Sequence, residues 1–257
     1  MRIGFDAKRA FQNFTGLGNY SRFIIQSLLD SPSEHEYFAY TPKLNEKVHF
    51  SNRLRIALPQ TAMPKSLWRS WGINQQLKKD HIDIFHGLSN ELPWQIQQSG
   101  IKSVVTIHDL IFMRYPELYP MIDRWIYRRK FKAACEQADC IIAISQQTKQ
   151  DIVEMLQISP SKIEVVYQDC DPAFRKKLPS EHISAVRKKY QLNKPYILCV
   201  ATIAERKNQL TLVKAFEALH NSEIELVLVG GKSSYQSQIE EYIRQKNLTG
   251  VHIINGV

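Results

Sequence analysis

The chain has 257 residues, of which 44% are hydrophobic and 10% aromatic, a composition that supports packed cores and excludes an intrinsically disordered protein. Its 34 Lys and Arg residues exceed its 25 Asp and Glu residues, and the formal net charge of +9 favours anionic partners without choosing among nucleotides, anionic lipid and nucleic acid. No stretch approaches the roughly 18 apolar residues of a membrane span, and the first residues enter a strand pattern without a leader, so we expect a cytoplasmic protein.

Short apolar segments alternate with helical patterns along the first two thirds of the chain. Unbroken apolar strands imply a sheet covered on both faces, which is typical of a parallel α/β sheet. Between the strands, Tyr20, Ile24 and Leu28 recur at helical spacing, and Ser145 is a suitable N-cap for a helix from Gln146 to Leu156. The expected strands are Arg2–Phe5, Tyr37–Tyr40, Ile82–Phe85, Ser103–Ile107, Cys140–Ile144 and Glu164–Tyr167.

The glycine-containing segment Thr15-Gly16-Leu17-Gly18-Asn19-Tyr20 follows the first strand and precedes a helix. Small residues there would let a ligand approach the free N–H groups of the helix N-terminus, whereas the alternative is that the glycines only permit a turn. Dinucleotide binding is disfavoured, because Ser21 stands where a third glycine would be and about ten residues separate the strand from Gly16.

Two histidines follow expected strands. His86 closes the segment 82–85, and His108 closes the segment 103–107. The carboxyl ends of parallel strands are where open α/β sheets bind ligands. Both histidines are therefore candidate site residues, although a lone histidine is more often structural.

The segment from 114 to 132 is rich in basic and aromatic residues. A helix there would present either a solvated basic face with its aromatic side chains in the core, or a basic and aromatic surface for an anionic membrane. We favour the first interpretation and leave the second as an alternative. The residues are Arg114, Arg124, Trp125, Tyr127, Arg128, Arg129, Lys130, Phe131 and Lys132.

A domain boundary is expected near residues 171 to 179, where two X-Pro pairs flank a basic stretch. It gives two domains, 1–173 and 174–257. The second domain has too few elements for a complete doubly wound sheet, so we expect it to be truncated or completed by another chain. Its expected elements are the strand Tyr196–Ala201, the helix Asn208–Leu219, the strand Glu225–Val229, the helix Ser234–Lys246 and the strand Val251–Ile254.

In this second domain, Glu205-Arg206-Lys207-Asn208 places two cations at the beginning of an expected helix, where acidic residues are more usual. Cations and a helix N-terminus together can bind a diphosphate. The alternative is an ordinary exposed loop.

Five segments follow one another with a recognisable order and spacing: Met1–Asp6, Gly16–Tyr20, Thr106–Asp109, Ala138–Asp151 and Arg206–Asn208. In this order they resemble the family 4 glycosyltransferases with the GT-B fold, over essentially the whole chain. The resemblance implies a Rossmann-like N-terminal domain with a parallel sheet on the acceptor side, and an incomplete second Rossmann-like domain that binds a nucleotide-sugar. It also implies a retaining transferase that needs no cofactor and no metal.

The resemblance assigns roles by position. It implies that His108 lies beside the transferred sugar, that Arg206 and Lys207 bind the donor diphosphate, and that Gly16 and Gly18 form a glycine loop facing the cleft. Possible acceptor or sugar contacts are Asn19, Tyr20, His86 and Asp109.

The chain also departs from the family pattern. Ala201-Thr202 stands where the family often has glycine, and Gln168-Asp169-Cys170-Asp171 stands where many members have Asn-Gly-Val-Asp. The later loop with two glutamates that holds the donor sugar is missing; Glu217 and Glu225 have its spacing, which we take as coincidence.

The resulting expectation is transfer of a mannose-like hexose from a GDP- or UDP-linked donor to a glycan or lipid-linked acceptor in surface polysaccharide synthesis, with peripheral contact to an anionic membrane at its inner face. The alternative is a catalytically incomplete fragment or accessory subunit that binds acceptor without turnover. Nucleic-acid binding is not expected, because no recognisable module is present and the basic residues are widely spread.

Overall fold

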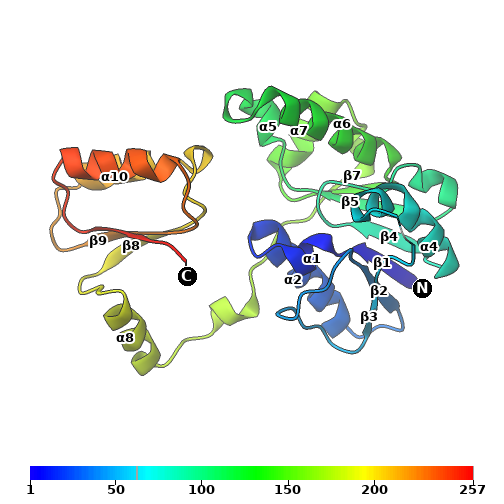
Figure 1. The fold of residues 1–257 in the computed structure, drawn as a ribbon, viewed down its shortest axis with the longest axis horizontal. Coiled ribbons are helices and arrows are strands. Elements are labelled where there is room, and N and C mark those ends of the chain that lie inside the picture. Colours follow the sequence, from blue (N-terminus) through cyan, green and yellow to red (C-terminus); the bar gives the residue numbers. More distant parts are fainter. Residues whose placement is uncertain (62, 257) are drawn as a thin grey trace. The chain divides into compact units, whose positions relative to one another are not determined.

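The structure is a computed structural model that describes residues 1–61 and 63–256. The chain divides into two compact units, Met1–Pro172 and Ala173–Val257, here called unit 1 and unit 2 (Figure 1). Each unit contains a parallel sheet with helices between the strands. The expected α/β class with parallel sheets is therefore confirmed.

Unit 1 is built on a seven-stranded sheet with the order β3-β2-β1-β4-β5-β6-β7, in which all neighbours pair in parallel. Strand β3 escaped prediction because it is a short edge strand whose Arg55 and Ile56 are exposed, so its apolar run is interrupted. The strands are β1 Arg2–Asp6, β2 Glu36–Tyr40, β3 Leu54–Ala57, β4 Ile84–Gly87, β5 Lys102–Ile107, β6 Cys140–Ala143 and β7 Ile163–Val165.

Both faces of this sheet are buried, as the unbroken apolar strands predict. In β2, Tyr37 and Ala39 pack with α1 and α2 on one face, whereas Phe38 and Tyr40 pack with η1 and α4 on the other. The helical elements of unit 1 are α1 Lys8–Gln12, α2 Gly16–Asp30, α3 Lys65–Leu67, η1 Trp68–Gly72, α4 Ile73–Lys79, η2 Ile96–Ser99, α5 Ile111–Arg114, η3 Pro116–Leu118, α6 Met121–Gln137, α7 Gln146–Leu156 and η4 Pro160–Lys162.

Helix α7 begins where its capping residue predicts. The Ser145 hydroxyl accepts a hydrogen bond from the backbone N–H of Thr148 at 3.1 Å, which satisfies one of the free donors of the first turn. The predicted N-cap is confirmed.

Helix α6 contains most of the basic and aromatic segment, and the favoured interpretation of that segment is wrong in part. Phe131 is buried and packs edge-on against Phe112, with ring centroids 5.2 Å apart. Trp125, by contrast, is 63% exposed. Tyr127 is also exposed at 39%, although its ring meets Phe112 edge-on at 5.7 Å. Trp125 lies on another side of the helix, so the pattern of one buried aromatic face does not hold. Arg114 belongs to the separate helix α5.

Unit 2 has a three-stranded parallel sheet with the order β10-β9-β8. Its strands are β8 Tyr196–Val200, β9 Glu225–Val229 and β10 Val251–Ile254, and its helical elements are α8 Ser180–Lys189, η6 Glu205–Lys207, α9 Gln209–Ala218 and α10 Tyr235–Gln245, with η5 Pro172–Arg175 at the boundary. The core of unit 2 lies between this sheet, α9 and α10. None of the helices described in either unit is long and apolar enough to span a bilayer.

Candidate active site

The sheet of unit 1 brings the candidate histidines onto neighbouring strands. Strands β1, β4 and β5 are adjacent, with Phe5 opposite His86 and Gly87 opposite Val105. Because β4 lies two residues later than expected, His86 sits inside the strand rather than behind it. His108 follows the last residue of β5, so it lies at the carboxyl edge of the sheet, as predicted.

His108 is held on both ring nitrogens. Its Nε2 lies 3.0 Å from the carbonyl oxygen of Leu88, and its Nδ1 lies 3.1 Å from the side-chain Nε2 of Gln168. A carbonyl can only accept and an amide NH₂ can only donate, so Nε2 carries the proton and Nδ1 is the acceptor. Burial lowers the pKa of the ring, partly offset by the Leu88 hydrogen bond, and this keeps His108 neutral.

Behind His108 lies a second polar layer. The Nε2 atom of His86 and the hydroxyl of Tyr20 both reach the Thr106 hydroxyl, at 2.9 and 3.1 Å. The Tyr20 ring meets the His108 ring edge-on at 4.6 Å between centroids. Burial, followed by the nearby His108, lowers the pKa of His86 to about 4. Tyr20, His86 and His108 are all buried, and direct contact of Tyr20 and His86 with a ligand stays a prediction.

The glycine segment is not a loop: helix α2 begins at Gly16 and contains both glycines. The Asn13 side-chain oxygen accepts hydrogen bonds from the backbone N–H groups of Thr15 at 2.9 Å and Gly18 at 3.1 Å. A Cβ on Gly18 would lie 1.7 Å from the Asn13 carbonyl oxygen, whereas a Cβ on Gly16 would meet nothing within 4 Å. Gly18 is therefore required by packing, and exposed Gly16 is the position that a ligand could approach.

Asn19 and Asp109 are solvent-facing. The Asn19 side-chain oxygen accepts a hydrogen bond from Arg22. The Asp109 carboxylate accepts one from the Ile111 backbone N–H at 3.3 Å, at the start of α5. Both side chains keep polar capacity toward solvent, as a contact with a hydroxylated ligand would require.

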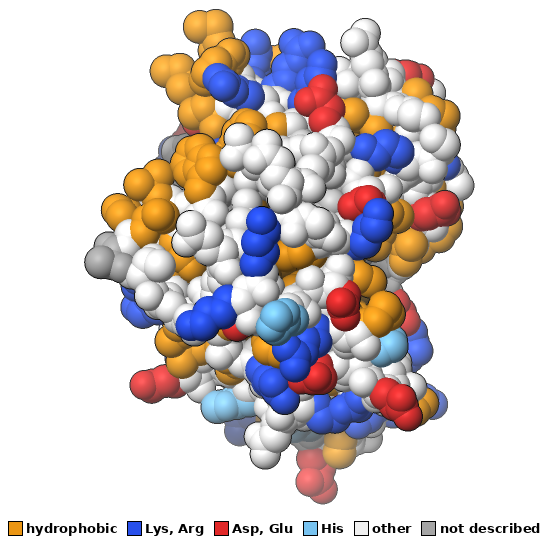
Figure 2. Space-filling view, turned by 90° about the vertical axis from the view of Figure 1, so that its right-hand side faces the viewer, with side chains coloured by type: hydrophobic (Ala, Val, Ile, Leu, Met, Phe, Trp, Pro, Cys, Tyr) orange, Lys and Arg blue, Asp and Glu red, His pale blue; other side chains and the backbone are white. Residues whose placement is uncertain are grey.

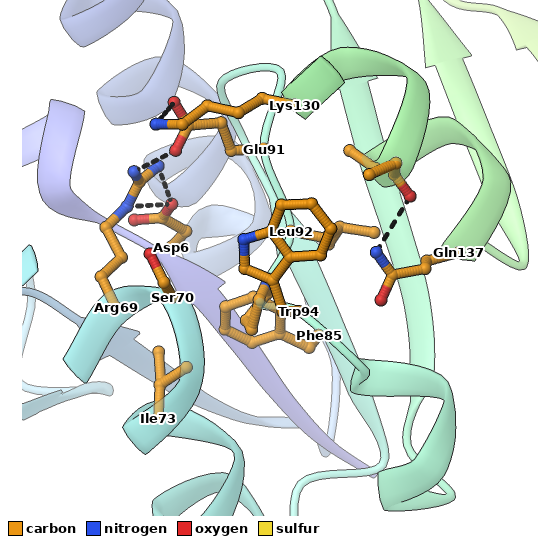
Figure 3. A pocket seen from close by; sticks show the side chains of 13 residues that line it. Asp6, Arg69, Ser70, Ile73, Phe85, Glu91, Leu92, Trp94, Lys130 and Gln137 are labelled. Atoms are coloured by element: carbon orange, nitrogen blue, oxygen red, sulfur yellow. Dashed lines mark hydrogen bonds and ion pairs between the residues drawn. The ribbon is translucent and has the colours of Figure 1, made fainter. Parts of the chain in front are cut away.

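A buried charge cluster at the end of β1 was missed from the sequence (Figure 3). The Arg69 guanidinium donates to Asp6 Oδ2 at 2.6 and 2.8 Å and also pairs with Glu91, and Lys130 lies 3.5 Å from Glu91. Burial alone lowers the pKa of Arg69, but the two carboxylates outweigh it and raise that pKa. The apolar strand before Asp6 signals a carboxylate at the sheet edge, whereas nothing in the sequence around Arg69 marks it as a partner.

The pocket beside this cluster is small. Trp94, Leu92 and Phe85 line it together with the charged side chains (Figure 3). Its interior leaves about 20 Å³, enough for a water molecule and too little for a sugar ring. The paired charges therefore brace the sheet edge beside this small pocket.

In unit 2, Arg206 and Lys207 lie in the short turn η6, one residue before α9. Asn208 adopts a left-handed conformation with φ 53°, which asparagine tolerates, and it separates the turn from the helix. The two cations therefore precede the helix, which begins one residue later than expected. Both side chains are exposed, and neither forms an ion pair within the described part of the chain.

The segment that leads into the turn with these cations is held by hydrogen bonds from a buried side chain. The buried Gln209 side chain donates to the Thr202 carbonyl at 3.0 Å and accepts from the Ala204 N–H at 3.4 Å. A Cβ on Gly230 would lie 1.8 Å from the Ala201 carbonyl oxygen. Gly230, which directly follows strand β9, therefore packs against the backbone of Ala201 with no room for a side chain.

Two units, each with a parallel sheet and helices between its strands, make up the GT-B fold, and solved structures with this fold are similar to the chain. A glycosyltransferase from Rickettsia africae ESF-5 matches with a TM-score of 0.67 and 16% identity, covering 100% of this chain and 68% of that one. Anabaena Alr3699/HepE in complex with UDP-glucose matches with a TM-score of 0.70 and 16% identity, covering 100% of this chain and 69% of that one.

The chain belongs to Glycosyltransferase Family 4, which matches residues 15–174, and residues 183–257 match Glycosyl transferases group 1. The resemblance inferred from the sequence is thereby confirmed. O-antigen chain mannosyltransferase B of Escherichia coli is 27% identical over 240 residues, 85% of this chain and 60% of the relative. The serotype-specific mannosyltransferase WbdA of Escherichia coli is 31% identical over 144 residues, 54% of this chain and 17% of the relative. This chain thus spans less than two thirds of these relatives.

Proposed function

We propose that this protein takes part in retaining transfer of a mannose-like hexose from a nucleotide-sugar to a glycan or lipid-linked acceptor in surface polysaccharide synthesis. The observation that carries the proposal is the match of both units, in chain order, to glycosyltransferase families. The mannosyltransferase relatives support the sugar, and the UDP-glucose complex of a structural neighbour supports a nucleotide-linked donor. A lipid-linked acceptor would bring the protein to the cytoplasmic face of a membrane.

Unit 2 would bind the donor. Arg206 and Lys207 are exposed cations on a braced turn next to the N-terminus of α9. Cleavage at the anomeric carbon builds negative charge on the leaving diphosphate, and fixed cations stabilise that charge in the transition state. The proposal assigns this task to the two side chains rather than to a metal ion.

Unit 1 would contribute His108 beside the transferred sugar. Because its Nε2–H is engaged by Leu88 and its Nδ1 accepts from the Gln168 amide, the ring would offer only Nδ1 to a ligand, as a hydrogen-bond acceptor, once that amide has moved aside. A sugar hydroxyl is the donor that fits this atom. Gly16 would leave room for the ligand, and Asn19 and Asp109 would offer further polar contacts.

The donor assignment is tested by calorimetry with GDP, UDP, GDP-mannose and UDP-glucose. Lys207→Ala is expected to weaken diphosphate binding by about 1–3 kcal/mol, the range of a charge-assisted hydrogen bond. Lys188→Ala, which removes the same charge from an exposed position on α8, is the matched control and should bind as wild type does. Equal affinity in all three proteins would reject the assignment.

The second candidate function is an accessory or incomplete protein that binds acceptor without turnover. It is favoured by the positions of Glu217 and Glu225, which have the spacing of the family's glutamate pair but lie in α9 and in β9 rather than in one loop. Glu217 is also engaged by Tyr242, and Glu225 lies 3.4 Å from His252. Release of nucleotide from donor in the presence of acceptor separates the two functions: binding without release favours the accessory role.

A further inference from the structure

Helix α6 has two distinct sides. Its inner side packs on the core of unit 1 through Phe131, Ala134 and Cys135. Met121, Ile122, Trp125, Arg128 and Arg129 recur at helical spacing on another side and are all exposed. These five residues are called the α6 outer face.

The apolar side chains of the α6 outer face are highly exposed to solvent. Met121 is 73% exposed, Ile122 is 71% exposed and Trp125 is 63% exposed. They occupy consecutive turns, so they form one patch rather than scattered surface residues, which need no explanation. In Figure 2, hydrophobic side chains gather beside Lys and Arg side chains at the upper end of the molecule, the height at which α5 and α6 lie in Figure 1.

The patch is preformed by its neighbours. Arg124 donates to the Pro116 carbonyl at 3.1 Å, which ties the start of α6 to the turn η3. The Arg129 guanidinium lies 5.7 Å from the centre of the Trp125 ring, a cation–π distance. The apolar end and the basic end of the face are thus directly joined.

The charges around the patch favour an anionic surface. Arg128 and Arg129 continue the apolar residues along the helix, with no ion pair to either within the described chain. The acidic residues nearby are exposed Glu117, half-buried Asp123 in the first turn, and Glu136, which pairs with Lys132 at 3.8 Å. An apolar, tryptophan-bearing end followed by arginines is the composition of helices that lie in the membrane–water interface.

We propose that the α6 outer face docks unit 1 on an anionic phospholipid bilayer, with Met121, Ile122 and Trp125 inserted among the headgroups and Arg128 and Arg129 bound to lipid phosphates. Helix α6 starts on the side of the sheet where β5 ends, so the docked surface lies at the same edge as His108. This inference goes beyond the proposed transfer reaction and does not depend on it, because binding to lipid requires no turnover.

Sedimentation of the chain with vesicles tests the proposal. The chain is expected to bind vesicles that contain phosphatidylglycerol, and to bind pure phosphatidylcholine vesicles at least tenfold more weakly. Trp125→Ser combined with Ile122→Ser, and separately Arg128→Gln combined with Arg129→Gln, should each lower binding about tenfold or more, since each surface cation and each buried apolar group contributes. Salt should weaken binding of the wild type.

Leu44→Ser combined with Lys47→Gln is the matched control, because both residues are exposed on unit 1 away from α6. It should bind vesicles as wild type does, and circular dichroism should show that every variant is folded. Equal binding by the wild type and the α6 variants would overturn the proposal. A dimer in light scattering that the Trp125→Ser and Ile122→Ser variant loses, without vesicle binding, would also overturn it and assign the face to a second copy of the chain.

Discussion

The two glycines of α2 provide a matched pair that separates packing from ligand access. Gly18→Ala would place a Cβ 1.7 Å from the Asn13 carbonyl oxygen. The position of a Cβ is fixed by its backbone and the oxygen is a backbone atom, so no side-chain rotation relieves the clash. Overpacking costs about 1–3 kcal/mol. Displacing Asn13 would also cost about 1 kcal/mol of capping, partly offset by the better helix propensity of alanine. Together these contributions give an expected loss of about 1–3 kcal/mol.

Gly16→Ala is the control two residues away. Neither glycine needs a positive φ, and a Cβ on Gly16 meets nothing within 4 Å, so its stability should be unchanged or rise by up to about 1 kcal/mol. Thermal unfolding should show a midpoint about 2–12 °C lower for Gly18→Ala than for wild type. Equal midpoints for the two variants would refute the packing argument. A stable Gly16→Ala protein that binds ligand poorly would instead support ligand access at Gly16.

The buried histidines of unit 1 and the N-cap of α7 can be tested in three further ways. The pKa of His86 in the folded protein, about 4, lies below its unfolded value near 6.5, so the unfolded state takes up the proton first as the pH falls. The free energy of unfolding should therefore drop by about 2 kcal/mol between pH 7 and pH 5. Denaturant titrations across this range should show a smaller pH dependence of that free energy for His86→Gln. Gln168→Ala should leave the fold intact and remove the donor to the Nδ1 atom of His108. The ¹⁵N NMR spectrum of the ring should then show a changed Nδ1 chemical shift, with Nε2 still protonated. An unchanged ring spectrum would contradict the contact. Ser145→Ala should cost about 1 kcal/mol of stability in urea unfolding, the usual value of an N-cap, and a loss below about 0.3 kcal/mol would contradict the role of the cap.

The sequence was sufficient for elements whose pattern is local. Buried parallel strands such as β6 and β9 contain continuous apolar runs, and the cap of α7 is marked by one residue, Ser145. The edge strand β3 was missed because exposure on an edge interrupts the apolar pattern. The start of α2 was misplaced because Gly16 and Gly18, which usually mark turns, are here helical.

For the candidate site, the sequence could place single residues at strand ends but could not predict their partners. His108 was located correctly at the end of β5, yet its contacts with Leu88 and Gln168 span 20 and 60 residues of sequence. Such long-range hydrogen bonds have no periodic signal. Trp125 was assigned to the core because its aromatic neighbours are there, and only the turn-by-turn direction of α6 shows that it faces solvent.

The pairing of Arg69 with both Asp6 and Glu91 has a consequence for how this sequence can change over time. Loss of Arg69 would leave two carboxylates close together and largely out of water, whereas loss of one carboxylate would leave the guanidinium only half compensated. Lysine is not a substitute, because it cannot donate in two directions from a planar group. Among relatives, Arg69 and Asp6 should therefore be inherited as a pair, and those that lack the arginine should carry a neutral residue at the position of Asp6, whereas Glu91 keeps Lys130 at 3.5 Å.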